Sequence, residues 1–220
     1  TQTSTAVTSG ALSYTGSTVI NVGNNITTSG GTIGMTGPVA ITGTPTFDST
    51  NGGGTAAGAT ISFSSTLNGA VPLILRAGTV GNVTFTGSVG NTAPLTNLTF
   101  TSAALIQIGN NITVTGANPL TFSSAVSLTG TSSITTTNNN ITFSSTLNGS
   151  QALTLSCGSG IMLFSGAVGG TTPLTSLSAT ASGGTVTQNS TVQTTGLVSY
   201  TGSTINAGGN ITTSGGTIGM

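Results

Sequence analysis

Acid–base, nucleophilic and metal chemistry depend on a few side-chain types, and this 220-residue sequence contains very few of them. It has one acidic residue, Asp48, one basic residue, Arg76, one cysteine, Cys157, and no histidine. General acid–base catalysis normally uses His, Asp, Glu or Lys, and glycoside hydrolysis uses a pair of carboxyl groups. Calcium needs several carboxylates, and nucleic-acid binding needs many basic side chains. We therefore expect no enzyme activity, no cofactor, no metal and no nucleic-acid partner.

The surroundings of the three reactive residues favour structural roles. Cys157 follows Leu153 and Leu155 in an alternating pattern, which predicts an inward, buried thiol without a partner to activate it. Arg76 alternates outward, and we expect it to be solvated or paired with Asp48. Asp48 precedes a Ser-Thr-Asn-Gly cluster, which is typical of an Asx-turn, in which the side chain accepts a hydrogen bond from the backbone.

The elements that position these residues are predicted to be short β-strands. The chain contains 49 Thr, 29 Ser, 35 Gly and 18 Asn, with a net charge of zero and 35% hydrophobic residues. Disordered chains combine low hydrophobicity with high net charge, so disorder is disfavoured. Apolar and hydroxyl residues alternate between turn residues, as in 61–63 and 120–122, and no segment has a helical period. No apolar run reaches the length of a membrane helix, so we expect no membrane insertion.

Two long sequence repeats indicate how the strands are organised. Residues 13–35, SYTGSTVINVGNNITTSGGTIGM, return as SYTGSTINAGGNITTSGGTIGM at 199–220. The long unit therefore spans 13–198, and the next copy starts at 199. A sub-repeat at 61–98 returns at 141–177, with ISFSSTLNG matching ITFSSTLNG. We expect residues 1–220 to form one continuous segment of a longer chain with tandem units.

The phenylalanines give the shortest period. The intervals between successive members of the series are 22, 15, 22, 21 and 21, and the series is Phe63, Phe85, Phe100, Phe122, Phe143 and Phe164. A period near 21 is typical of stacked β-coils, and the 80-residue sub-repeat would then contain about four coils.

These observations predict an all-β fold, a parallel β-helix (β-solenoid), right-handed, with coils of about 21 residues. Each side chain would lie over its equivalent about 4.8 Å away, so like residues stack on like. Stacked charges would repel, which accounts for their absence. The structural residues expected in these stacks are the six phenylalanines and, through amide ladders, Asn25 and Asn111.

Hydroxyl residues leave a second kind of surface function open. Threonines two residues apart occur at Thr42/Thr44/Thr46, Thr84/Thr86, Thr99/Thr101, Thr113/Thr115 and Thr185/Thr187. A flat array of threonines on a solenoid could bind ice or a glycan. The pairs do not recur at one fixed coil interval, so the sequence favours this function less than a structural one.

The phrases NITFSSTLNGSQALTLSCGSG (140–160), FSGAVGGTTPLTSLSATAS (164–182) and NITTSGGTIGM (210–220) resemble the strand repeats of giant bacterial surface proteins. These proteins are of the filamentous-haemagglutinin type, exported by two-partner secretion. The resemblance implies a right-handed parallel β-helix, a secreted, cell-surface location, and roles in adhesion, cell contact or matrix, with any binding tip outside this segment. The chain carries less charge than the family, which favours lateral association.

We therefore expect a structural repeat of an extracellular, uncharged, protease-resistant filament. The alternative is the stalk of a large adhesin. The expected partners are further copies of the chain and, beyond them, a cell surface or glycans.

Overall fold

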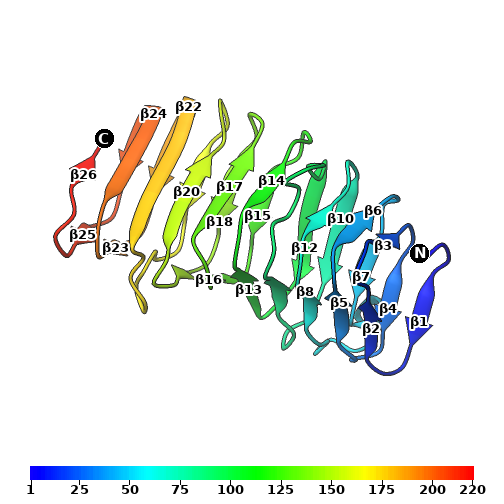
Figure 1. Ribbon diagram of the computed structural model, residues 1–220. Coiled ribbons are helices and arrows are strands. Elements are labelled where there is room, and N and C mark those ends of the chain that lie inside the picture. Colours follow the sequence, from blue (N-terminus) through cyan, green and yellow to red (C-terminus); the bar gives the residue numbers. More distant parts are fainter.

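The computed structural model, which covers residues 1–220, is an elongated rod of stacked coils in which all strand pairs are parallel (Figure 1). The fold is the predicted all-β solenoid, with about ten coils of about 21 residues. Helical structure is limited to the short 3-10 turn η1 (Asn51–Gly53). No helix could cross a membrane.

Each coil contributes one segment to each of three walls, here called A, B and C in chain order. Wall A contains β1 (Ala6–Thr8), β4 (Ile26–Thr28), β7 (Thr46–Asp48), β10 (Pro72–Arg76), β12 (Asn97–Ser102), β15 (Leu120–Phe122), β18 (Ile141–Phe143) and β21 (Met162–Phe164). Wall B contains β2 (Leu12–Thr15), β5 (Ile33–Thr36), β8 (Ile61–Phe63), β11 (Val83–Phe85), β13 (Leu105–Ile108), β16 (Ala125–Leu128), β19 (Leu147–Asn148), an isolated bridge at Val168, β23 (Val192–Thr194) and β25 (Ile211–Thr213).

Wall C contains β3 (Ile20–Val22), β6 (Val39–Ile41), β9 (Leu67–Asn68), an isolated bridge at Val89, β14 (Ile112–Val114), β17 (Ser132–Thr136), β20 (Ala152–Ser156) and β26 (Ile218–Gly219). Two longer strands, β22 (Ser176–Gln188) and β24 (Val198–Ala207), run along wall C, turn the corner and continue along wall A.

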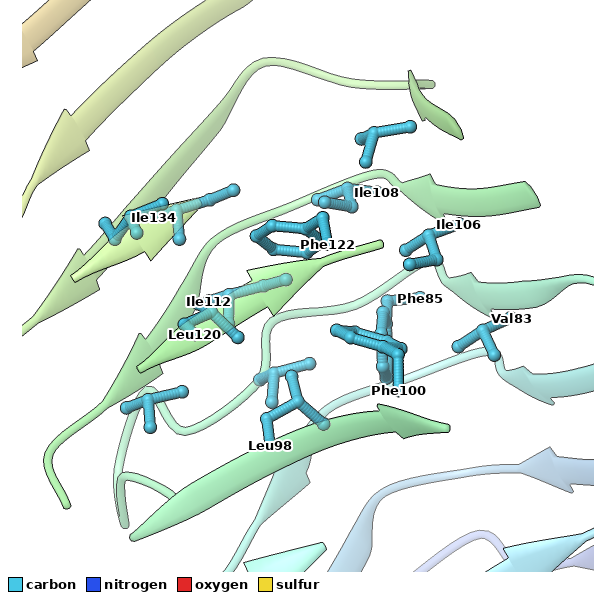
Figure 2. Packing of buried hydrophobic residues seen from close by; sticks show 14 of the residues in the cluster. Val83, Phe85, Leu98, Phe100, Ile106, Ile108, Ile112, Leu120, Phe122 and Ile134 are labelled. Atoms are coloured by element: carbon cyan, nitrogen blue, oxygen red, sulfur yellow. The ribbon is translucent and has the colours of Figure 1, made fainter. Parts of the chain in front are cut away.

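The alternation in the sequence decides which residues enter the core. In strands such as β8, β11 and β18 the first and third residues are buried and the middle residue is partly exposed. Side chains of successive strand residues point to opposite faces, so a three-residue strand places two apolar residues inside. The result is one continuous core of 46 buried hydrophobic residues along the rod. Figure 2 shows part of this core.

Coil length varies at one place in particular. Ile61 stacks on Val83, an offset of 22 in the sequence, whereas Ile33 stacks on Ile61 with an offset of 28. The additional residues form a loop between β7 and β8 that contains η1. The strands therefore keep their register, and the additional residues of this one coil form a loop outside the walls.

The long repeat extends further toward the N-terminus than residue 13. Residues 1–12 also match residues 187–198, and the structure gives Gln2 and Gln188 equivalent bonds. The Gln2 backbone oxygen accepts from the Gly23 amide at 3.0 Å, and the Gln188 oxygen accepts from the Gly208 amide at 2.6 Å. Both glutamines are buried. The unit therefore repeats in structure from Gln2 onward.

The sub-repeat does not contain a whole number of coils. From β8 to its copy β18 there are eleven wall segments, counting the bridge at Val89, which is three coils and two further walls. Three and two thirds coils agree with the expected number of about four, but they are not a whole number of coils. The offset between the two copies is not a whole multiple of the coil length, so the copies cannot lie on the same wall.

The asparagine hydrogen bonds at the corners are the same in both copies of the sub-repeat, although the two copies lie on different walls. Asn68 Oδ1 accepts from the Thr92 amide at 3.1 Å, and its copy Asn148 accepts from Thr171 at 2.9 Å. The glycines that follow have φ of 155° and 132°, in the range that favours glycine. Asn68 lies in wall C and Asn148 in wall B, so this corner motif works at either position.

Candidate functional site

The two charged side chains lie together at the corner between walls A and B, here called the charged corner. Arg76 is stacked on Asp48 in the parallel register of β10 and β7, and Arg76 Nη1 lies 3.6 Å from Asp48 Oδ2. The Asp48 side chain is 8% exposed and that of Arg76 31%. The opposite charges occupy neighbouring coils, which is the favourable arrangement for cross-strand pairs.

Asp48 also organises the loop that follows it. Its Oδ1 accepts from the Thr50 amide at 2.7 Å and from the Thr50 hydroxyl at 2.6 Å, and its Oδ2 accepts from the Gly52 amide at 2.8 Å. The bond to the amide two residues on is that of the predicted Asx-turn. The carboxylate is therefore fully engaged by the loop and the ion pair.

The loop itself packs closely onto the neighbouring turn. Ser49 is buried, and its hydroxyl bonds the Ala59 backbone oxygen at 2.7 Å. The amides of Thr79 and Val80 donate to the oxygens of Ala56 and Ala57. Hydrogen bonds thus hold the loop to the rod at both ends and along its side. No pocket is found on the surface of the molecule.

We expect Asp48→Ala to lower the free energy of unfolding by about 1–3 kcal/mol, because three donors lose their acceptor in a largely buried position. Arg76→Ala should cost less, under about 1 kcal/mol, because the pair is partly exposed and screened by water. Urea unfolding of the two variants and the double variant checks this. A larger effect for Arg76→Ala would show that the ion pair, not the turn, matters more.

Cys157 and Tyr200 are the remaining ionisable side chains in the core. The Cys157 thiol is buried, as the alternation predicts, and lies 3.4 Å from the Gly160 oxygen. Tyr200 is 2% exposed and its hydroxyl has no hydrogen-bond partner. Burial raises the pKa of the Cys157 thiol above its ordinary 9.0 and the pKa of the Tyr200 hydroxyl above its ordinary 10.0.

These two groups predict the pH dependence of stability. Both stay protonated in the folded chain at pH values where the unfolded chain ionises them, so unfolding releases protons in alkali and stability falls above about pH 9. Between pH 4 and pH 8 we expect a nearly constant urea midpoint. The Cys157→Ala/Tyr200→Phe variant should lose the alkaline decline. A midpoint that moves strongly between pH 4 and 8 would contradict the prediction.

The six phenylalanines are buried, but they lie on two walls. Phe63 and Phe85 stack in wall B with ring centroids 5.5 Å apart. Phe100, Phe122, Phe143 and Phe164 follow in wall A, where Phe122 and Phe143 are 4.8 Å apart. Phe85 meets Phe100 edge-on at 6.3 Å, where the stack crosses the core (Figure 2).

Asn25 and Asn111 are exposed at corners, and they do not stack on other asparagines as amide ladders would require. Asn25 Oδ1 accepts from the Thr46 amide at 2.9 Å, and Asn111 Oδ1 accepts from the Ser133 amide at 2.9 Å. Asn138 and Asn140 make the same kind of bond to the next coil. These side chains therefore link successive coils by satisfying backbone amides at corners.

The predicted threonine pairs are spread over all three walls. Thr84 lies in wall B, Thr99 and Thr187 lie in wall A, and Thr113 lies in wall C. They do not form one array.

A different set of hydroxyl residues does align, on the outer face of wall C. The parallel registers of β14, β17, β20, β22 and β24 produce two columns, which together are called the hydroxyl face. One column is Ser133, Thr154, Ser178 and Ser199; the other is Thr113, Thr135, Ser156, Thr180 and Thr201. Sequence inspection missed it because serine and threonine exchange within each column.

Comparisons with protein families, with characterised proteins and with solved structures find no match to this chain.

Proposed function

We propose that this chain is a structural repeat of an extracellular or cell-surface β-solenoid fibre. The observation that supports the proposal best is the second copy of the unit. Residues 187–220 enter the stack with the same strand pattern as residues 1–35, and they pack on the preceding coils without a break. Tandem units would therefore extend one continuous rod.

The mechanical properties of such a fibre follow from its bonding. Backbone hydrogen bonds run from coil to coil along the rod, and one core of 46 hydrophobic residues runs inside it. Each coil contacts only its neighbours, so length can grow without changing the packing. The near absence of charge removes repulsion between neighbouring rods. We infer a stiff, protease-resistant filament that self-associates.

The alternative within the same fold is the stalk of a large secreted adhesin that presents a binding tip to a cell surface or glycans. The sequence resemblance to filamentous-haemagglutinin-type proteins supports the secreted location. Electron cryo-microscopy of the producing cells distinguishes the two roles. Ordered assemblies of many rods would support the structural fibre, whereas single rods anchored at one end would support the stalk and overturn the fibre.

A second candidate function is binding of ice or a glycan by the hydroxyl face. The observation that favours it is the two-column register over five successive strands, at about 4.8 Å between strands. Inhibition of ice recrystallisation tests it. Thr135→Leu should abolish any activity, whereas Thr121→Leu on wall A should retain it. Equal effects of both substitutions would exclude the hydroxyl face.

A further inference from the structure

One stretch of sequence occurs twice in this structure, in two different environments. Ile33 and Met35 are 0% and 1% exposed, because Ile61 and Phe63 of the next coil pair with them in wall B. Their copies, Ile218 and Met220, lie in the last coil and are 49% and 63% exposed. Ile26 is likewise buried, whereas its copy Ile211 is partly exposed.

The internal copy shows which residues fit this end of the rod. The coil that covers Ile33 and Met35 begins after Thr36 and includes β6 and β8. An equivalent coil of a further unit would cover Ile218 and Met220 by the same contacts. A further unit of this chain, starting at the equivalent of residue 36, would therefore fit this end face.

The two copies do not lie on the same walls. β1 in wall A corresponds to β23 in wall B, and β2 in wall B corresponds to β24, which begins in wall C. β3 in wall C corresponds to the second half of β24, which lies in wall A. β5 in wall B corresponds to β26 in wall C. Every matching pair is displaced by one wall in the same direction.

The displacement follows from the number of segments in a unit. From β2 to β24 there are 25 wall segments, counting β22 as two and the bridges at Val89 and Val168 as one each. This is eight full coils of three walls and one wall more. The sub-repeat likewise does not return to its starting wall, because its eleven segments are not a multiple of three.

We propose that successive units of the fibre are related by one third of a turn about its axis. This inference rests on the proposed function, because it concerns tandem units in one rod. One unit rises eight and one third coils, or about 40 Å, and three units complete 25 coils, or about 120 Å. The fibre has the symmetry of a threefold screw.

The rotation decides which partners such a rod fits. The charged corner recurs between walls B and C in the second unit and between walls C and A in the third. The hydroxyl face likewise moves to a new side in each unit. A flat ligand would meet equivalent residues only at every third unit, whereas neighbouring rods can meet the same surface from three directions.

Disulfide trapping in the 220-residue chain tests the wall on which each segment lies. Cys157 is first replaced by alanine, so that the two introduced cysteines are the only ones. Ser178 and Ser199 are register partners in wall C, and parallel neighbours about 4.8 Å apart are within disulfide range. The Ser178→Cys/Ser199→Cys variant should form the bond in the folded state. The Ala167→Cys/Leu197→Cys variant should not, because Ala167 precedes Val168 in wall B, and Leu197 would lie over it only if the units were not rotated. The opposite result, or no bond in either variant, would overturn the rotation.

A longer chain tests the screw directly. The test chain would be residues 1–220 followed by two further copies of 36–220. Every unit would carry Ala117→Cys, at an exposed corner position, and Cys157→Ala. Gold labels on the cysteines should appear in electron tomograms at steps of one third of a turn and about 40 Å. Labels in one straight line would overturn the proposal.

Two outcomes distinguish the screw symmetry from the fibre function. Native filaments whose repeats show no rotation would leave the fibre in place and remove the screw. Rotated labels on the recombinant rod, with no filaments around the producing cells, would leave the screw in place and remove the fibre function.

Discussion

Phe122→Ala is expected to lower the free energy of unfolding by about 3–5 kcal/mol, the usual cost of removing a buried phenylalanine. Phe122 is fully buried between Phe100 and Phe143, with ring centroids at 5.4 and 4.8 Å. The coils above and below are held by backbone hydrogen bonds, so they cannot close the space. The cavity therefore remains, and the contacts on both sides of the ring are lost.

Urea unfolding followed by far-ultraviolet circular dichroism measures this effect. Thr121→Ala is the matched control, because Thr121 is the neighbouring residue in the same strand and points outward. Its effect should stay within about 0.5 kcal/mol. Similar losses for the two variants would mean that the stability of the coil does not depend on the aromatic stack.

Gly149→Ala is expected to be at least as damaging, although it adds only one methyl group. Gly149 has φ of 132°, and a Cβ there would lie 2.4 Å from the Leu128 backbone oxygen of the coil below. The substitution combines an unfavourable backbone conformation, about 1–3 kcal/mol, with a clash that requires the coils to separate. We expect a total loss above about 3 kcal/mol.

Gly52→Ala separates the two contributions. Gly52 also has a positive φ, 69°, but a Cβ at that position has no atom within 4 Å. It should therefore lose only the conformational part, about 1–2 kcal/mol. The same unfolding experiment compares the two variants. Equal losses would show that close coil contact at the Asn148–Gly149 corner is unimportant.

The phenylalanine spacing shows how much of the architecture was predictable. Intervals of 22 and 21 correctly indicate one coil, because the phenylalanines at these intervals have their rings in contact between adjacent coils. The interval of 15 between Phe85 and Phe100 is about two thirds of a coil, and it marks the change from wall B to wall A. The sequence therefore contained a sign of the wall shift, but its meaning requires knowing that a coil has three walls.

The asparagines and hydroxyl residues were less predictable. The bonds of Asn25 and Asn111 depend on which backbone amides face them at a corner, and composition does not specify that. The hydroxyl face depends on strand register across five coils of unequal length. A shift of one residue in any coil would point its hydroxyls inward.

The sequence by itself determined the fold class, the coil length, the buried alternating residues and the role of Asp48. These properties are local or periodic, and period-two alternation, turn residues and spacing near 21 specify them directly. The tertiary structure alone decided the number of walls, the wall on which each repeat lies and the alignment of the hydroxyl face. The reason is physical: these features depend on how many wall segments each stretch of chain forms, and that number is the sum over all coils and loops, which no local pattern specifies.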